Sequence, residues 1–141
     1  MLLITIAVFL LNREKIEKRL LKNISFKITN LLQTTVQISD VDFKYNGDLM
    51  INNFIIFDHK NDTLIYVDKI TTSILTPTNI LTSNTKLTSL DLSNGVIKII
   101  KHPGDSLTNF EVFITKVKQD NNTEIKDFSL ELKNLILNDF R

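Results

Sequence analysis

Apolar and polar side chains follow two different periods along this chain, and the period changes near residue 34. In residues 12–33 apolar side chains recur at steps of three and four, as at Ile16, Leu20, Ile24 and Ile28, which is the spacing of one helix face. From residue 35 the period is two, as in a strand that is buried on one side. The pattern therefore predicts an amphipathic helix that covers the end of a β-sheet.

Five segments with a period of two predict five long strands. Asn46 and Gly47 form a tight-turn signal between the first two segments. Because the connections leave no run long enough for repeated helical crossovers, we expect an antiparallel meander. The predicted strands cover residues 35–45, 48–57, 63–75, 86–101 and 127–140.

Two of the connections contain signals for short helices. Pro77 stands in a helix-start context in the stretch TPTNILTSN. The stretch NFEVFITKV (residues 109–117) is compatible with a strand or a helix, and Asn109 as an N-cap favours the helix. These helices offer little cover for an apolar face of five strands. We therefore expect that the sheet curls strongly, that its apolar face binds something, or that further chain covers it.

Three similar segments, LMINNFII, LDLSNGVI and LELKNLIL, centre on Asn53, Asn94 and Asn134. They recur at intervals of about 40 residues, which indicates a repeated structural unit. At each asparagine the alternation of apolar residues shifts by one position, and a β-bulge in a long strand predicts such a shift. For the middle segment alone, where Gly95 follows the asparagine, a two-residue hairpin turn is the alternative.

Residues 1–11, MLLITIAVFLL, are apolar except for Thr5. A membrane-spanning helix needs about 20 such residues, and a signal peptide needs a basic flank before its apolar core. We expect a shortened membrane anchor, because no polar face interrupts the run. The alternative is the end of a helix that packs on protein.

Composition and charge remove several classes of function. The 141 residues make one domain or a piece of a larger one, and the net charge of +1 provides no field that would recruit nucleic acid. No cysteine is present, so a disulfide framework or a thiol nucleophile is excluded. His59 and His102 lie in polar loops without partners at ligand spacing, which predicts exposed histidines. We expect no enzyme activity, no catalytic or metal site, and no cofactor.

Longer stretches of the chain resemble a known family. NDTLIYVDKITTSI, and KLTSLDLSNGVIKIIK followed by DSLTNFEVFI, match its strand, loop and helix-start patterns in order, after VQISDVDFKYNGDLMINNFIIFD. The chain resembles the N-terminal region of TamB-type proteins (the translocation and assembly module), in the form found in Bacteroidota. The same plan is similar to AsmA-like proteins and to the chorein-type N-terminus of bridge-like lipid transfer proteins.

The resemblance implies a mainly β fold, in which a long, curved antiparallel sheet forms an open groove beside an N-terminal amphipathic helix and one or two short helices. It implies an envelope-biogenesis protein, anchored in the inner membrane with its body in the periplasm. Such a protein passes lipid acyl chains along the groove or supports outer-membrane protein assembly with a barrel partner. On this basis residues 1–11 are a truncated anchor, 12–33 the helix, and 34–141 the start of a groove that is incomplete at its C-terminus.

The groove hypothesis predicts which side chains face lipid, and it has a rival. The rival is a structural β-sandwich, an adhesin-like interaction domain whose apolar faces meet each other and bind no lipid. Under the groove hypothesis the lipid-facing candidates are the apolar strand residues Val41, Phe43, Leu49, Ile51, Phe54, Ile56, Leu64, Tyr66, Ile70, Leu90, Leu92, Ile97, Ile99, Leu130, Leu132 and Leu137.

Overall fold

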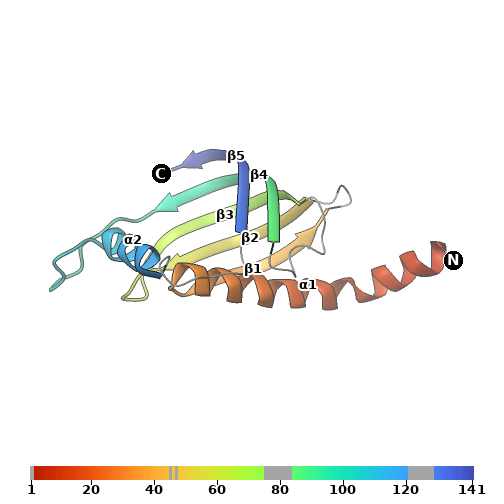
Figure 1. Cartoon of the computed structure of the whole chain (residues 1–141), viewed down its shortest axis with the longest axis horizontal. Coiled ribbons are helices and arrows are strands. Elements are labelled where there is room, and N and C mark those ends of the chain that lie inside the picture. Colours follow the sequence, from red (N-terminus) through yellow and green to blue (C-terminus); the bar gives the residue numbers. More distant parts are fainter. Residues whose placement is uncertain (1, 45, 47, 75–83, 121–128) are drawn as a thin grey trace.

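The computed structural model describes residues 2–44, 46, 48–74, 84–120 and 129–141. The first element is a single helix, α1, from Leu2 to Leu32. The predicted amphipathic helix is therefore confirmed, but it is continuous with the apolar run that precedes it. Leu20 and Ile24 are buried, while charged side chains such as Lys22 are exposed. Figure 1 shows α1 running along β1, with its N-terminal end projecting beyond the sheet.

All five predicted strands are present, with bounds close to those expected. They form one sheet in the order β1-β2-β3-β4-β5. The first four strands are antiparallel neighbours. The bounds are β1 Val36–Phe43, β2 Asp48–Phe57, β3 Thr63–Ile74, β4 Asn84–Ile97 and β5 Ser129–Phe140.

The prediction of a wholly antiparallel meander is wrong for the last strand, because β5 runs parallel to β4. Leu92 of β4 lies opposite Leu137 of β5. Parallel neighbours require a crossover of about a dozen residues or more, and the chain between β4, which ends at Ile97, and β5, which begins at Ser129, is long enough for one. The crossover contains the second helix, α2, from Asn109 to Asp120 (Figure 1).

The predicted helix at residue 109 is confirmed, although its cap is one residue earlier than expected. The Thr108 amide donates to the Glu111 carboxylate at 2.8 Å, and the Glu111 amide donates to the Thr108 hydroxyl at 3.2 Å. This reciprocal arrangement is a capping box. The Asn109 side chain is therefore not used as the N-cap, and it bonds instead to Asp58 and to the backbone after β4. The short helix expected near Pro77 lies outside the described residues.

The hydrophobic core lies between α1 and the first three strands. Leu64 and Val67 of β3 and Val41 of β1 have at most 1% of their surface exposed. Phe110 and Phe113 of α2 pack against the edge of this core. Among the described side chains, the core therefore occupies the β1 to β3 side of the sheet, and those of β4 and β5 have less cover.

A row of five residues crosses the sheet where each strand shifts its alternation, and we call it the crease. Its members lie at the same register position on neighbouring strands, between regularly paired residues on both sides. Asn53, Asn94 and Asp139 have left-handed φ angles of 50°, 56° and 52°, a conformation that asparagine and aspartate tolerate better than most residues. The crease consists of Ser39, Asn53, Asp68, Asn94 and Asp139.

The crease confirms the predicted shift at Asn53 and corrects its mechanism. Ile51 and Phe54 are both buried although they are three residues apart. However, the pairing register between β1 and β2 is the same before and after Asn53. A bulge inserts one residue into one strand and changes the register. Here every strand is irregular at the same level, so no residue is inserted.

Two further predictions about the repeat are settled by the pairing. Leu92 and Ile97, on the two sides of Asn94, both pair with β3, so the hairpin alternative is wrong and the segment is one strand. In the third segment Asn134 lies opposite Ser89 in regular pairing. The crease residue of β5 is Asp139, and the prediction of Asn134 is wrong.

Candidate functional site

The helix-facing side of the sheet contains most of the predicted lipid-facing residues, and over β1 to β3 it is filled by protein. These residues belong to the core around α1, with exposed fractions between 0% and 9%. In this structure they contact protein and are closed to a ligand. They are Val41, Leu49, Ile51, Phe54, Ile56, Leu64 and Ile70.

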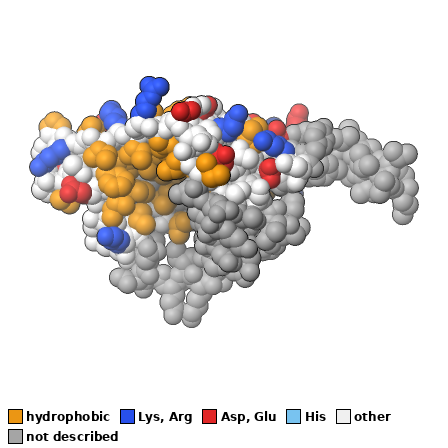
Figure 2. All heavy atoms as spheres, turned by 90° about the horizontal axis from the view of Figure 1, so that it is seen from above, with side chains coloured by type: hydrophobic (Ala, Val, Ile, Leu, Met, Phe, Trp, Pro, Cys, Tyr) orange, Lys and Arg blue, Asp and Glu red, His pale blue; other side chains and the backbone are white. Residues whose placement is uncertain are grey.

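The same face continues over β4 and β5, where its cover ends. Leu90 and Leu92 are partly buried against the core. Ile97 pairs with Ile65 and is 40% exposed, and Leu137 pairs with Leu92 and is 55% exposed. Ile99, just after β4, is 57% exposed. Figure 2, a view from the side on which β5 lies, shows hydrophobic side chains gathered on the surface. We call Ile97, Ile99 and Leu137 the apolar margin.

Tyr66 lies on the opposite face of the sheet from the other predicted residues. It pairs with Ile55, whereas the neighbouring pair Phe54 and Val67 is buried in the core, and neighbouring residues of a strand point to opposite faces. The Tyr66 hydroxyl donates to the Asn53 side chain at 2.9 Å. Asp68, the crease residue of β3, lies between Tyr66 and Ile70 and shifts the alternation. The two residues therefore face opposite sides, although a regular period of two places them on one face. The side chains of Phe43, Leu130 and Leu132 lie outside what the structure describes.

Gly95 allows a close approach between β4 and β5 at the apolar face. The Phe140 ring lies where a Cβ atom of residue 95 would stand, and Phe140 packs against the core. Any larger residue at position 95 would displace the ring. Phe140 therefore closes the apolar face beside the crease, while the apolar margin stays open.

A polar cluster lies at the end of the sheet where β3 begins and β4 ends. Its centre is Asp58, whose side chain is fully buried. One carboxylate oxygen of Asp58 accepts from the Lys60 and Asp62 amides at 2.8 and 2.9 Å. The other oxygen contacts His102 Nε2 at 2.7 Å and accepts from the Asn109 amide group at 3.1 Å. We call Asp58, Asp62, His102 and Asn109 the loop junction.

Asn109 connects this junction to the segment that follows β4. It is fully buried, its side chain donates to the Lys98 carbonyl at 3.0 Å, and its side-chain oxygen accepts from the Ile100 amide at 2.9 Å. The loop junction therefore fixes the start of α2 to the β2–β3 loop.

The prediction of exposed histidines without partners is wrong. The side chains of His59 and His102 are 17% and 11% exposed, and each pairs with a carboxylate. His59 Nε2 lies 2.6 Å from the Asp105 carboxylate, and the two imidazole rings are 5.5 Å apart, edge to face. Local sequence spacing does not reveal these partners, because Asp58 and His102 are 44 residues apart.

Hydrogen bonding sets the charge of the two central carboxylates. Burial alone would raise the pKa of Asp58, but bonds from His102, from the Lys60 and Asp62 amides and from Asn109 together lower that pKa to about 2. The hydrogen bond from His59 lowers the pKa of Asp105.

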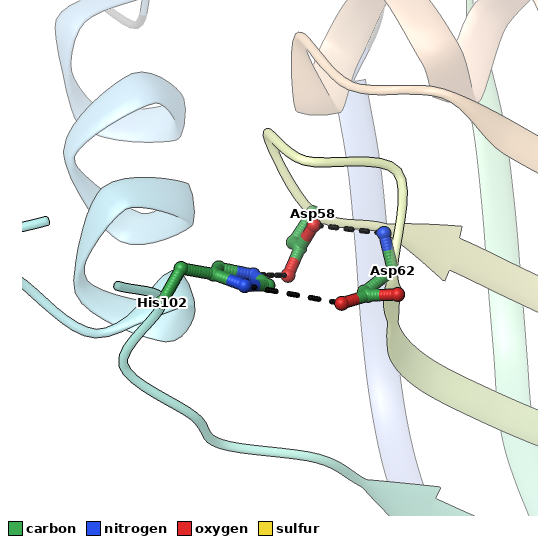
Figure 3. A group of neighbouring side chains, drawn as sticks. All are labelled: Asp58, Asp62 and His102. Carbon is green, nitrogen blue, oxygen red and sulfur yellow. Dashed lines mark hydrogen bonds and ion pairs between the residues drawn. The ribbon is translucent and has the colours of Figure 1, made fainter. Parts of the chain in front are cut away.

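Asp58, Asp62 and His102 bring metal-ligating atoms within 4.8 Å of one another (Figure 3).

A scan against models of known protein families and searches of curated proteins and of solved structures found no match to this chain. Over the described residues, neither helix combines the length and the apolar character needed to cross a membrane.

Proposed function

We propose that this chain binds lipid acyl chains on the apolar margin of its sheet, as part of an envelope-biogenesis protein of the TamB type. The observation that carries the proposal is the exposure of Ile97 and Leu137 on the sheet face that forms the buried core over β1 to β3, together with the exposure of Ile99 just beyond β4. Exposed apolar side chains that continue a core are typical of surfaces that meet lipid or protein. The sequence resemblance favours lipid as the ligand.

The physical basis of binding is the transfer of methylene groups out of water. Each buried CH₂ group stabilises the bound state by about 0.8 kcal/mol. In this proposal an acyl chain lies across β4 and β5, where Leu90 and Leu92 form the floor and Leu137 the rim. The core between α1 and β1 to β3 stays filled by protein.

The proposal includes a cellular setting and further partners, taken from the resemblance alone. The sheet would stand in the periplasm and be held at the inner membrane, with α1 nearest the bilayer. A curved sheet would let successive strands extend the lipid path, and an outer-membrane assembly barrel would be a further partner. No catalytic step is needed, because the chain would conduct lipid passively.

Paired variants on the two faces of β5 test the proposal. Ile136 pairs with Asp91, and its neighbour Leu137 pairs with Leu92; the two side chains are 47% and 55% exposed. We expect Leu137→Asn to lower the lipid that co-purifies with the chain from a bacterial envelope, because it places an amide on the acyl path. Ile136→Asn is the matched control and should leave the lipid content unchanged.

Lipid mass spectrometry of the purified chains provides the readout. Equal lipid content in the two variants would contradict binding at the apolar margin. A stable, monomeric wild-type chain without lipid would favour the rival interaction domain.

A further inference from the structure

The His102 ring stands between two carboxylates, and each of its nitrogens faces one of them. Nε2 lies 2.7 Å from an Asp58 oxygen, and Nδ1 lies 3.8 Å from an Asp62 oxygen (Figure 3). The first distance is a short hydrogen bond. The second is too long for a hydrogen bond. Nε2 is therefore hydrogen-bonded to Asp58, whereas Nδ1 makes no hydrogen bond to Asp62.

The bond to Asp58 determines which nitrogen carries hydrogen. An ionised carboxylate only accepts hydrogen bonds, so the hydrogen lies on Nε2. In a neutral ring Nδ1 then has a free lone pair, and this lone pair faces the Asp62 carboxylate. Two electron-rich atoms facing each other repel, unless a positive charge lies between them.

The separation of these two atoms suits a shared metal ion. Nitrogen and oxygen ligands lie about 2.1 Å from Zn²⁺, so two ligands of a tetrahedral site are about 3.4 Å apart. We propose that His102 Nδ1 and the Asp62 carboxylate bind a divalent transition-metal cation of the Zn²⁺ class, with Asp58 orienting the imidazole. A carboxylate on the far nitrogen is the usual support of a metal-bound histidine. An imidazole ligand favours Zn²⁺ over Mg²⁺ or Ca²⁺.

The surroundings of the site agree with a cation. Asp58, Asp62 and Asp105 contribute three carboxylates, and one cation, Lys60, pairs with Asp105 at 3.8 Å while half of its side chain stays exposed. His59 repeats the arrangement beside the site: Nε2 contacts Asp105, and its buried Nδ1 has no hydrogen-bond partner. Asp62 is 53% exposed, so water can enter and complete the coordination.

A cation at this position would connect two segments that are distant in sequence. Asp62 ends the β2–β3 loop, and His102 lies between β4 and α2. The ion would therefore strengthen the attachment of α2 to the sheet. This role is independent of lipid binding at the apolar margin.

Zinc titration of the purified, untagged full chain tests the site. After dialysis against a chelator, isothermal titration calorimetry should show saturable binding of one Zn²⁺ per chain, and Zn²⁺ should raise the thermal unfolding midpoint. Asp62→Asn should weaken binding at least about tenfold, and its folding can be checked by circular dichroism, because Asp62 is half exposed.

His59→Gln is the matched control, since it breaks the neighbouring histidine–aspartate pair and removes no proposed ligand. It should retain the affinity of the wild-type chain within about twofold. Absence of saturable binding to the wild-type chain, or equal affinity of the Asp62→Asn variant, would overturn the proposal.

Discussion

Asp58 shows how a buried charge is held at the residue scale. Its two oxygens interact with four donors, from Lys60, Asp62, His102 and Asn109. A buried carboxylate is costly unless it is hydrogen-bonded in this way. The loop junction therefore favours the ionised form of Asp58 in the folded state.

The depressed pKa of Asp58 predicts how stability depends on pH. The pKa is lowered from 3.8 to about 2, so ionised Asp58 stabilises the folded chain above pH 4 and this contribution is lost as the pH falls through 2. The difference in unfolding free energy between wild type and Asp58→Asn should shrink as the pH falls from 4 to 2. Urea unfolding followed by circular dichroism measures it. A difference that does not change over this range would contradict the assignment.

The loop junction could be foreseen only in part from the sequence. The stretches DHKND and HPGD both indicate polar loops, and both lie between the regular elements of the structure. The sequence does not show that these two loops are neighbours. Once β3 and β4 are antiparallel neighbours, the loop before β3 and the segment after β4 must lie at one end of the sheet. Pairing at that end, Ile65 with Ile97, brings the histidines and aspartates together. Local spacing alone does not contain this information.

At the scale of elements, the crease links strands through matched irregularities. Asn94 donates to the Asp68 side chain at 3.3 Å, and Tyr66 donates to Asn53. These hydrogen bonds therefore connect crease residues, or residues next to the crease, on neighbouring strands. The crease keeps the buried apolar side chains of β1 to β3 on one face on both of its sides, while the pairing register is the same immediately before and after it.

Substitutions at Asn94 test the role of its left-handed backbone. The φ angle of Asn94 is 56°, and a β-branched residue there is strained by about 1–3 kcal/mol. We expect Asn94→Val to lower the free energy of unfolding by this amount. Asn94→Gly should have little effect, because glycine adopts this conformation freely. Chemical denaturation of both variants measures the difference. A valine variant as stable as the glycine variant would show that the crease is not strained.

The strands were predictable because their period of two is a local property, whereas the crease and the direction of β5 were not. A bulge and a crease produce the same shift in the sequence of one strand, and only the partner strands distinguish them. In β3 the spacing of three between the apolar residues Val67 and Ile70 does indicate that the alternation shifts between them. The parallel direction of β5 depends on how the chain connects it to β4, which no pattern in β5 itself specifies.

At the scale of the whole molecule, one face of the sheet is covered unequally. α1 contacts β1, and the core extends to β3. The apolar margin on β4 and β5 stays exposed. This asymmetry is the basis of the proposed function, because a lipid chain can complete the cover that the helices do not provide.

The most direct test of lipid binding uses the absence of tryptophan from the chain. Single-tryptophan variants Leu137→Trp and Ile136→Trp place one fluorophore on each face of β5. A lipid with a brominated acyl chain quenches a tryptophan that it touches. Titration with this lipid should quench the fluorescence of the variant at position 137 saturably and leave the variant at position 136 unaffected. Equal quenching of both variants, or none, would contradict the account.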